Sequence, residues 1–174
     1  GSRIVINDCA DTNVKNVSGY GDINTKLHLE IELETINTNV MGFTAIASWT
    51  YNFFKNQPKG HFVAISSIAG LRGGSFAPAY NASKAYQINY LEALRQKSYK
   101  DGFKSITITD VRPGFVNTEM AKGDKKFWMA SSQKAAKQII SAIYNKKKVI
   151  YVSKRWEIIA VLLKLLPRWL YEKL

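Results

Sequence analysis

Tyr80 and Lys84 stand four residues apart at the start of a predicted helix, so both side chains are expected on one helical face. An ammonium group beside a phenol favours the phenolate and lowers the phenol pKa from about 10 toward neutrality. A tyrosine tuned in this way donates or accepts a proton at working pH. The pair therefore indicates acid–base chemistry, although a Tyr-x-x-x-Lys spacing by itself is common and is mostly structural.

Ser67 precedes Tyr80 by thirteen residues, at the point where a predicted strand meets a loop rich in Gly and Ser. From this place its hydroxyl can point across a cleft toward the Tyr80 oxygen and hydrogen-bond a substrate carbonyl. Ser66 is the alternative, but the thirteen-residue spacing favours Ser67. Ser67, Gly70 and the Tyr–Lys pair together are far more specific than either part.

Apolar periodicity predicts the elements that must position these residues. Helices are predicted over 30–56, 78–100, 131–145 and 154–173, and strands over Arg3–Ile6, His61–Ser66, Ser105–Val111 and Val149–Val152. Buried strands that alternate with long helices predict parallel strands joined by right-handed crossovers. The expected fold class is therefore α/β, a doubly wound parallel sheet with helices on both faces and ligands at the carboxyl ends of its strands.

Four segments resemble the short-chain dehydrogenase/reductase family, in order and at its usual spacing. They are Ile65-Ser66-Ser67-Ile68-Ala69-Gly70, Ala79-Tyr80-Asn81-Ala82-Ser83-Lys84, Asp110-Val111-Arg112-Pro113-Gly114-Phe115-Val116-Asn117-Thr118, and Asn39-Val40-Met41-Gly42 in the long helix. The similarity runs from about Gly19 to Thr118. It implies a Rossmann-like enzyme that transfers hydride between NAD or NADP and a carbonyl or alcohol, with a lipophilic substrate suggested by the apolar C-terminal segment.

The resemblance also implies a role for each matched residue. Tyr80 would be the general acid in reduction and the base in oxidation, while Lys84 would lower its pKa and bind the nicotinamide ribose. Ser67 would orient and polarise the substrate carbonyl. Asn39 would hold a water that links Lys84 to solvent. The implied cofactor-binding positions are Gly19, Tyr80, Lys84, Pro113, Gly114, Val116 and Thr118.

Simpler interpretations stay open for several of these residues. Asn39 can be an ordinary helix-surface residue with Asn37 as a near neighbour, although the Asn-x-x-Gly match favours Asn39. Thr118 can cap the turn that follows it. His28 and His61 lack metal-ligand spacing, so no metal site is predicted.

The start of the chain departs from the family pattern. The glycine-rich turn that would cradle a cofactor pyrophosphate does not occur in the sequence. Residues 1–16 look like remnants of upstream strands, with Gly1–Asp8 similar to the family's second strand and Cys9–Asn13 similar to the end of its third. We therefore expect the N-terminal strands to be incomplete, with cofactor-binding segments missing. Asp8 would favour NAD if it ends the second strand, and NADP stays equally open.

The net charge of +12 is concentrated near the C-terminus. Residues 1–121 hold 12 Lys/Arg and 10 Asp/Glu, whereas residues 122–174 hold 13 Lys/Arg and 3 Asp/Glu. Residues 154–174 combine cations with a broad apolar face, Trp and Tyr, and are too short to span a bilayer. Two alternatives follow: a helix in a membrane interface, or a helix packed on the domain, a second subunit or the cleft. The expected domains are 1–153, catalytic, and 154–174, a basic amphipathic helix.

The remaining expectations concern compartment and partners. The single cysteine cannot form an internal disulfide, which fits a cytoplasmic protein, with peripheral membrane contact through 154–174 as a further expectation. A homodimer or homotetramer is expected through the helices at 30–56 and 78–100. The alternative function is a non-catalytic binding or membrane-scaffold protein with this fold, against which the complete set of matched residues argues. A nucleic-acid binder rests on charge alone and ranks last, so no nucleic-acid partner is predicted.

Overall fold

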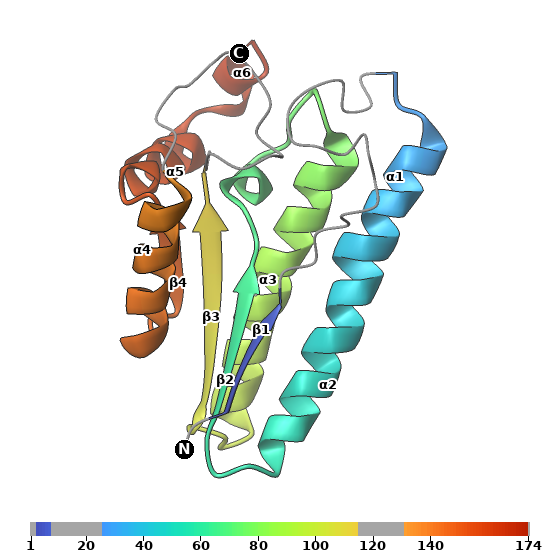
Figure 1. The fold of residues 1–174 in the computed structure, drawn as a ribbon. Coiled ribbons are helices and arrows are strands. Elements are labelled where there is room, and N and C mark those ends of the chain that lie inside the picture. The colour runs from blue at the N-terminus through green and yellow to red at the C-terminus, as the bar shows by residue number, and fades with distance from the viewer. Residues whose placement is uncertain (1–2, 8–25, 115–130, 174) are drawn as a thin grey trace.

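The computed structural model describes residues 3–7, 26–114 and 131–173. In these residues four parallel strands form one sheet, in the order β1-β2-β3-β4 (Figure 1). The strands are β1 (Arg3–Asn7), β2 (Gly60–Ile65), β3 (Ile106–Pro113) and β4 (Val149–Val152). The predicted α/β class and the parallel sheet are confirmed.

One face of the sheet is covered by two long helical rods (Figure 1). The first is continuous and consists of α1 (Leu29–Ile36), a π-helical segment η1 (Asn37–Gly42) and α2 (Phe43–Lys55). The second is α3 (Pro78–Lys100). Large side chains fill the space between the rods and the sheet: Phe43, Phe54, Phe62, Leu91 and Ile108.

The other face of the sheet carries α4 (Ser132–Tyr144) (Figure 1). Its Ala135 packs with Val63, Val111 and Val152 in a second, smaller core. Successive residues of a strand point to opposite faces, so Phe62 enters the first core and Val63 the second. Helices on both faces are therefore confirmed, and the apolar run of β2 is explained by its burial on both sides.

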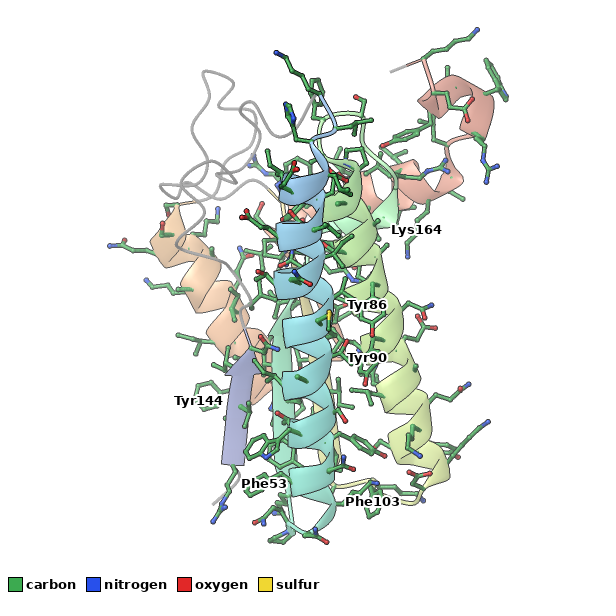
Figure 2. All side chains as sticks on the ribbon, turned by 90° about the vertical axis from the view of Figure 1, so that its right-hand side faces the viewer. Phe53, Tyr86, Tyr90, Phe103, Tyr144 and Lys164 are labelled. Carbon is green, nitrogen blue, oxygen red and sulfur yellow. The ribbon has the colours of Figure 1, made fainter. Side chains whose placement is uncertain are left out.

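Tyr86 and Tyr90 of α3 lie in the seam between α3 and α2 (Figure 2). The Phe43 ring meets both edge-on, at centroid distances of 6.4 Å to Tyr86 and 5.7 Å to Tyr90. The hydroxyls of Thr44 and Tyr86 hydrogen-bond at 2.7 Å. These contacts fix the rod that contains α2 relative to α3, close to Lys84 of α3.

The C-terminal segment differs from the prediction of a single helix over 154–173. It consists of α5 (Arg155–Leu165) and α6 (Arg168–Tyr171). Leu166 adopts an extended backbone with ψ of 124°, because the residue before a proline is disfavoured in the helical region, and Pro167 then begins the next turn. Pro167 thus separates the segment into two helices.

The N-terminal strand also corrects a prediction. Gly1–Asp8 was expected in the place of the family's second strand, but β1 pairs directly with β2, with Val5 opposite Phe62. In the doubly wound strand order 3-2-1-4-5-6 the second strand lies between the third and the first, and the third ends the sheet. A strand that is followed by β2, β3 and β4 in both chain order and sheet order therefore does not occupy the second position. The hydrogen bonds between β1 and β2 show this placement. The sequence could not predict it, because a short run of β-branched residues does not indicate which strand it will pair with.

Candidate active site

The candidate residues lie around the carboxyl ends of β2 and β3. Ser67 follows β2, Pro113 ends β3, and the short 3₁₀ turn η2 (Ile68–Leu71) leads from Ser67 toward the start of α3. In Figure 1 this turn lies beside the upper end of β3, at the same edge of the sheet as α5 and α6. Ligands of open parallel sheets bind at this edge.

The first turn of α3 is set up by Pro78 and by a carboxylate from α1. Pro78 occupies the start of the helix, where its missing N–H costs nothing and its fixed φ suits the turn. The N–H of Ala79 donates to Oε2 of Glu32 at 3.1 Å. A negative charge at a helix N-terminus is favourable, so Glu32 anchors the end of α3 that carries Tyr80.

Lys84 is buried, with 5% of its surface exposed, and its ammonium faces the Tyr80 ring. The Nζ atom lies 5.7 Å from the centroid of that ring. It donates to the backbone oxygen of Ile65 at 3.3 Å, which ties it to the carboxyl end of β2. A second bond runs to Oε1 of Gln87 at 3.2 Å. The i, i+4 geometry expected for Tyr80 and Lys84 is present in α3.

Ser67 caps η2, and Gly70 holds that turn against α3. The Ser67 hydroxyl accepts a hydrogen bond from the Ala69 N–H at 3.1 Å. A Cβ added to Gly70 would lie 2.5 Å from the carbonyl carbon of Lys84, closer than real Cβ contacts. The glycine therefore permits the backbone of the serine loop to touch the backbone of α3, which brings Ser67 to the helix of Tyr80 and Lys84.

Ser66, the alternative to Ser67, is committed to a buried network. Its hydroxyl donates to the Asp110 carboxylate, which also pairs with the Arg112 guanidinium at 2.6 Å. Arg112 donates in turn to the Tyr151 hydroxyl at 3.0 Å. Ser66, Asp110 and Arg112 are all buried, so the structure gives Ser66 a scaffold role that the sequence did not reveal.

Asn39 is buried within the π-helical segment η1 rather than exposed on a helix surface. Its Nδ2 donates to the Ser83 hydroxyl at 3.1 Å. Its backbone oxygen accepts from Nε2 of Gln87 at 2.8 Å. Sequence reasoning missed Gln87, although a polar residue three positions after Lys84 on a helix could have drawn attention to it.

Gly114 of the Pro-Gly segment is enclosed by the C-terminal part of the chain. Its N–H donates to the Val152 oxygen at 2.6 Å. A Cβ at this position would lie 2.3 Å from the Trp156 ring. Trp156 thereby shapes the backbone beside Pro113, and nothing in the sequence pattern linked these residues. The other predicted cofactor positions, Gly19, Val116 and Thr118, lie outside the described residues, as does Asp8.

The loop after Ser67 is fastened to α5 and α6. Arg72 donates to the backbone oxygens of Leu163, at 2.8 Å, and of Leu166. Its guanidinium stacks 5.0 Å from the centroid of the Tyr171 ring. The Tyr171 hydroxyl donates to the backbone oxygen of Gly73. Arg72 thus satisfies carbonyl groups at the end of α5 and joins the tail to the candidate site.

A nearby hollow and the arrangement of possible metal ligands bear on what the site can bind. A hollow of about 440 Å³ borders Arg72, Pro78, Ala82 and Ala85, but Ala82 and Ala85 lie about 160° and about 140° around α3 from Tyr80, at about 100° per residue. Within residues 3–7, 26–114 and 131–173, no cluster of three or more His, Cys, Asp or Glu side chains could hold a metal ion.

Comparison with known proteins identifies the family. A family model described as short chain dehydrogenase matches residues 11–151. An uncharacterized oxidoreductase of Myxococcus xanthus is 36% identical over 111 residues, which cover 63% of this chain and 43% of that protein. The chain therefore matches less than half of this relative's length.

Solved structures agree in fold. A short-chain dehydrogenase/reductase of Burkholderia phymatum in complex with NAD is similar with a TM-score of 0.67 at 17% identity, covering 83% of this chain and 61% of that one. A short-chain dehydrogenase of Burkholderia cenocepacia in complex with NADP gives 0.61 at 17% identity, covering 93% and 66%. Because the family model matches well over half of the residues, the chain belongs to the short-chain dehydrogenase family.

Proposed function

We propose that the protein is an oxidoreductase that uses NAD or NADP to interconvert a carbonyl compound and its alcohol. The observation that carries this proposal is the buried Lys84 ammonium, 5.7 Å from the centre of the Tyr80 ring at the carboxyl edge of the sheet. A buried cation stabilises a phenolate far better than one in water, because the local dielectric constant is low. Tyr80 would then exchange a proton with the substrate oxygen.

The described residues fit the nicotinamide end of such a cofactor. Lys84 lies beside Ile65 at the end of β2, where parallel sheets bind ligands. We assign it the ribose hydroxyls, with Pro113 beside the nicotinamide and Gly114 shaping the backbone there. The cofactor supplies the hydride chemistry when it is bound. Ser67 would donate to the substrate oxygen, since its contact with the Ala69 N–H uses the hydroxyl only as an acceptor.

Titration of the intact protein with NADH and NADPH, followed by a panel of carbonyl compounds that includes long-chain ketones, tests this function. Tyr80→Phe should lose turnover by about a thousandfold or more and keep cofactor binding, because Lys84 stays in place. Undiminished turnover in Tyr80→Phe would exclude the proposed chemistry. Absence of cofactor binding by the wild-type protein would favour the non-catalytic binding or scaffold alternative.

The outward face of α5 and α6 supports peripheral contact with an anionic membrane surface. Trp156 and Ala160 are buried against the domain, yet Ile158 and Leu165, on the opposite side of α5, are 63% and 74% exposed. A helix that is apolar on both faces needs an apolar partner on each. Residues 122–174 hold 13 cationic and 3 acidic side chains, and this net positive charge complements anionic lipid headgroups. No helix in the described part of the chain is long and apolar enough to span a bilayer.

Point substitutions test this contact better than truncation, because Trp156 packs on Gly114 and its removal would disturb the domain. Leu165→Glu should reduce flotation with vesicles that contain phosphatidylserine and leave thermal stability unchanged. Arg155→Gln removes one cation and should weaken binding only at low salt. Equal flotation of wild type and Leu165→Glu would reject the membrane contact, and a change in oligomeric mass instead would assign the face to a second copy.

A homo-oligomer is proposed through the outer side of the rod formed by α1, η1 and α2. Met41 and Trp49 are exposed there, away from the buried face that carries Phe43, Ala47 and Phe54, and Ile46 at its flank is also exposed. Exposed apolar side chains repeated along one helix favour packing against another helix. Trp49→Glu should lower the mass measured by light scattering to that of a monomer. An unchanged mass would show that this side of the rod is not the interface.

A further inference from the structure

Gln87 of α3 is a polar side chain buried beside the candidate site. Only 1% of the residue is exposed. It lies one helical turn after Lys84, on the same face of α3. Burying an amide is unfavourable unless both of its ends are hydrogen-bonded, so its contacts indicate why it is there.

Gln87 joins Lys84 to Asn39 through the two ends of its amide. The Lys84 ammonium donates to Oε1 at 3.2 Å, and Nε2 donates to the backbone oxygen of Asn39 at 2.8 Å. The partners fix the orientation of the amide, because an ammonium group only donates and a carbonyl only accepts. The bridge therefore has a single arrangement that satisfies all three groups.

The π-helical segment η1 presents the acceptor for this bridge. In an α-helix the Phe43 N–H would bond to the Asn39 oxygen, but at the end of η1 it bonds instead to the Val40 oxygen, three residues earlier. Single π-helical turns inside α-helices are frequent at functional sites. The Asn39 side chain donates separately to the Ser83 hydroxyl at 3.1 Å, while its backbone oxygen accepts from Gln87.

We propose that Gln87 is a positioning residue that holds the Lys84 ammonium against Tyr80 through a direct amide bridge to Asn39. This inference rests on the proposed function and changes one part of it. The family resemblance implies a water between Lys84 and Asn39, whereas here a side-chain amide makes the link. An amide does not relay protons at neutral pH, so the link fixes the cation instead of conducting protons.

Gln87→Met tests the bridge, because methionine is close in volume but has no strong hydrogen-bonding group. Ionisation of Tyr80 is followed by phenolate absorbance, as the difference between each protein and the same protein with Tyr80→Phe. We expect it to move to higher pH by about one unit, a tenfold change in phenolate fraction. Binding of NADH and NADPH, followed by fluorescence, should weaken by about tenfold as Lys84 loses its fixed place.

The Glu32 carboxylate of α1, at 3.1 Å from the Ala79 N–H, and the Arg72 guanidinium of the serine loop are charged groups near this end of α3, and every variant retains both. Gln138→Met is the matched control. Gln138 is half-buried on α4, across the sheet from the candidate site. This variant should leave both the Tyr80 titration and cofactor binding unchanged.

Gln87→Glu provides a second variant of nearly the same size, which keeps an acceptor for Lys84. Its carboxylate offsets the field of Lys84 at Tyr80, so the phenol titration should again move to higher pH. If either variant folds and shows the wild-type titration and wild-type cofactor affinity, the positioning role is overturned. The titration needs no turnover, so it stays decisive even where the carbonyl panel shows no activity and the proposed function fails.

Discussion

At the scale of the residue, the adjacent serines Ser66 and Ser67 differ in their burial and in their hydrogen-bond partners. Ser67 is partly exposed and caps η2 through an accepted bond from Ala69. Ser66 is buried and donates to Asp110, which pairs with Arg112. The thirteen-residue spacing to Tyr80 favours Ser67 as the substrate-binding hydroxyl, and the commitment of Ser66 to the buried network supports the same choice.

Substituting each serine by alanine should separate activity from stability. Ser67→Ala is expected to lower kcat by about a hundredfold, the usual effect of removing one donor to a reacting oxygen, and to cost only about 1 kcal/mol of stability through the lost cap of η2. Ser66→Ala should cost about 1–3 kcal/mol of stability, because the buried Asp110 carboxylate loses a donor, while kcat per folded molecule stays near wild type. Kinetics and urea unfolding measure the two effects, and the reverse pattern would assign the substrate hydroxyl to Ser66.

At the scale of the element, the site depends on how closely the serine loop approaches α3. Gly70 makes this contact. Gly73 stands only three residues later, and a Cβ added to it would have no neighbour within 4 Å. The two glycines therefore form a matched pair in one loop, the first required by the packing and the second free of it.

Gly70→Ala should destabilise the protein by about 1–3 kcal/mol, because the added methyl group would overlap the Lys84 backbone. It should also lower kcat, since displacement of the loop moves Ser67 away from Tyr80. Gly73→Ala should change neither quantity appreciably. Comparison of the two variants by urea unfolding and steady-state kinetics checks this, and equal behaviour would show that the loop does not need the close approach.

At the scale of the whole molecule, His61 links strand packing to pH. His61 lies buried in β2, with Nε2 at 2.8 Å from the Thr109 hydroxyl of β3. Thr109 donates its own hydrogen to the Lys147 oxygen, so its oxygen accepts from the His61 ring. Burial lowers the pKa of His61 below its ordinary 6.5, and the charge of Lys146 acts in the same direction.

Because the pKa is lower in the folded protein, the unfolded chain binds more protons once the pH falls below 6.5. Stability from this group is complete above that pH and declines on acidification. The urea midpoint should therefore fall more between about pH 7.5 and about pH 5.5 in the wild type than in His61→Gln, which does not titrate. Identical pH dependence in the two proteins would contradict the lowered pKa.

Much of the fold could be predicted because its signals are local. The helix at 78–100 follows from Pro78 at its start and from Asp101–Gly102 directly after its end, and the strand at Val149–Val152 from its composition; both have the predicted bounds. The spacing of Tyr80 and Lys84 within one helix fixes their common face, whatever surrounds them. The family, the α/β class and the candidate site residues were therefore accessible from the sequence.

Only the tertiary structure decided how these pieces meet. The bridge from Lys84 through Gln87 to Asn39, the enclosure of Gly114 by Trp156, and the attachment of Arg72 to the end of α5 all join residues that lie far apart along the chain. Such contacts depend on which elements are neighbours in space, and periodicity within one segment carries no record of its neighbours. For the same reason β1 was assigned to the wrong strand position, and the tail was expected as one helix.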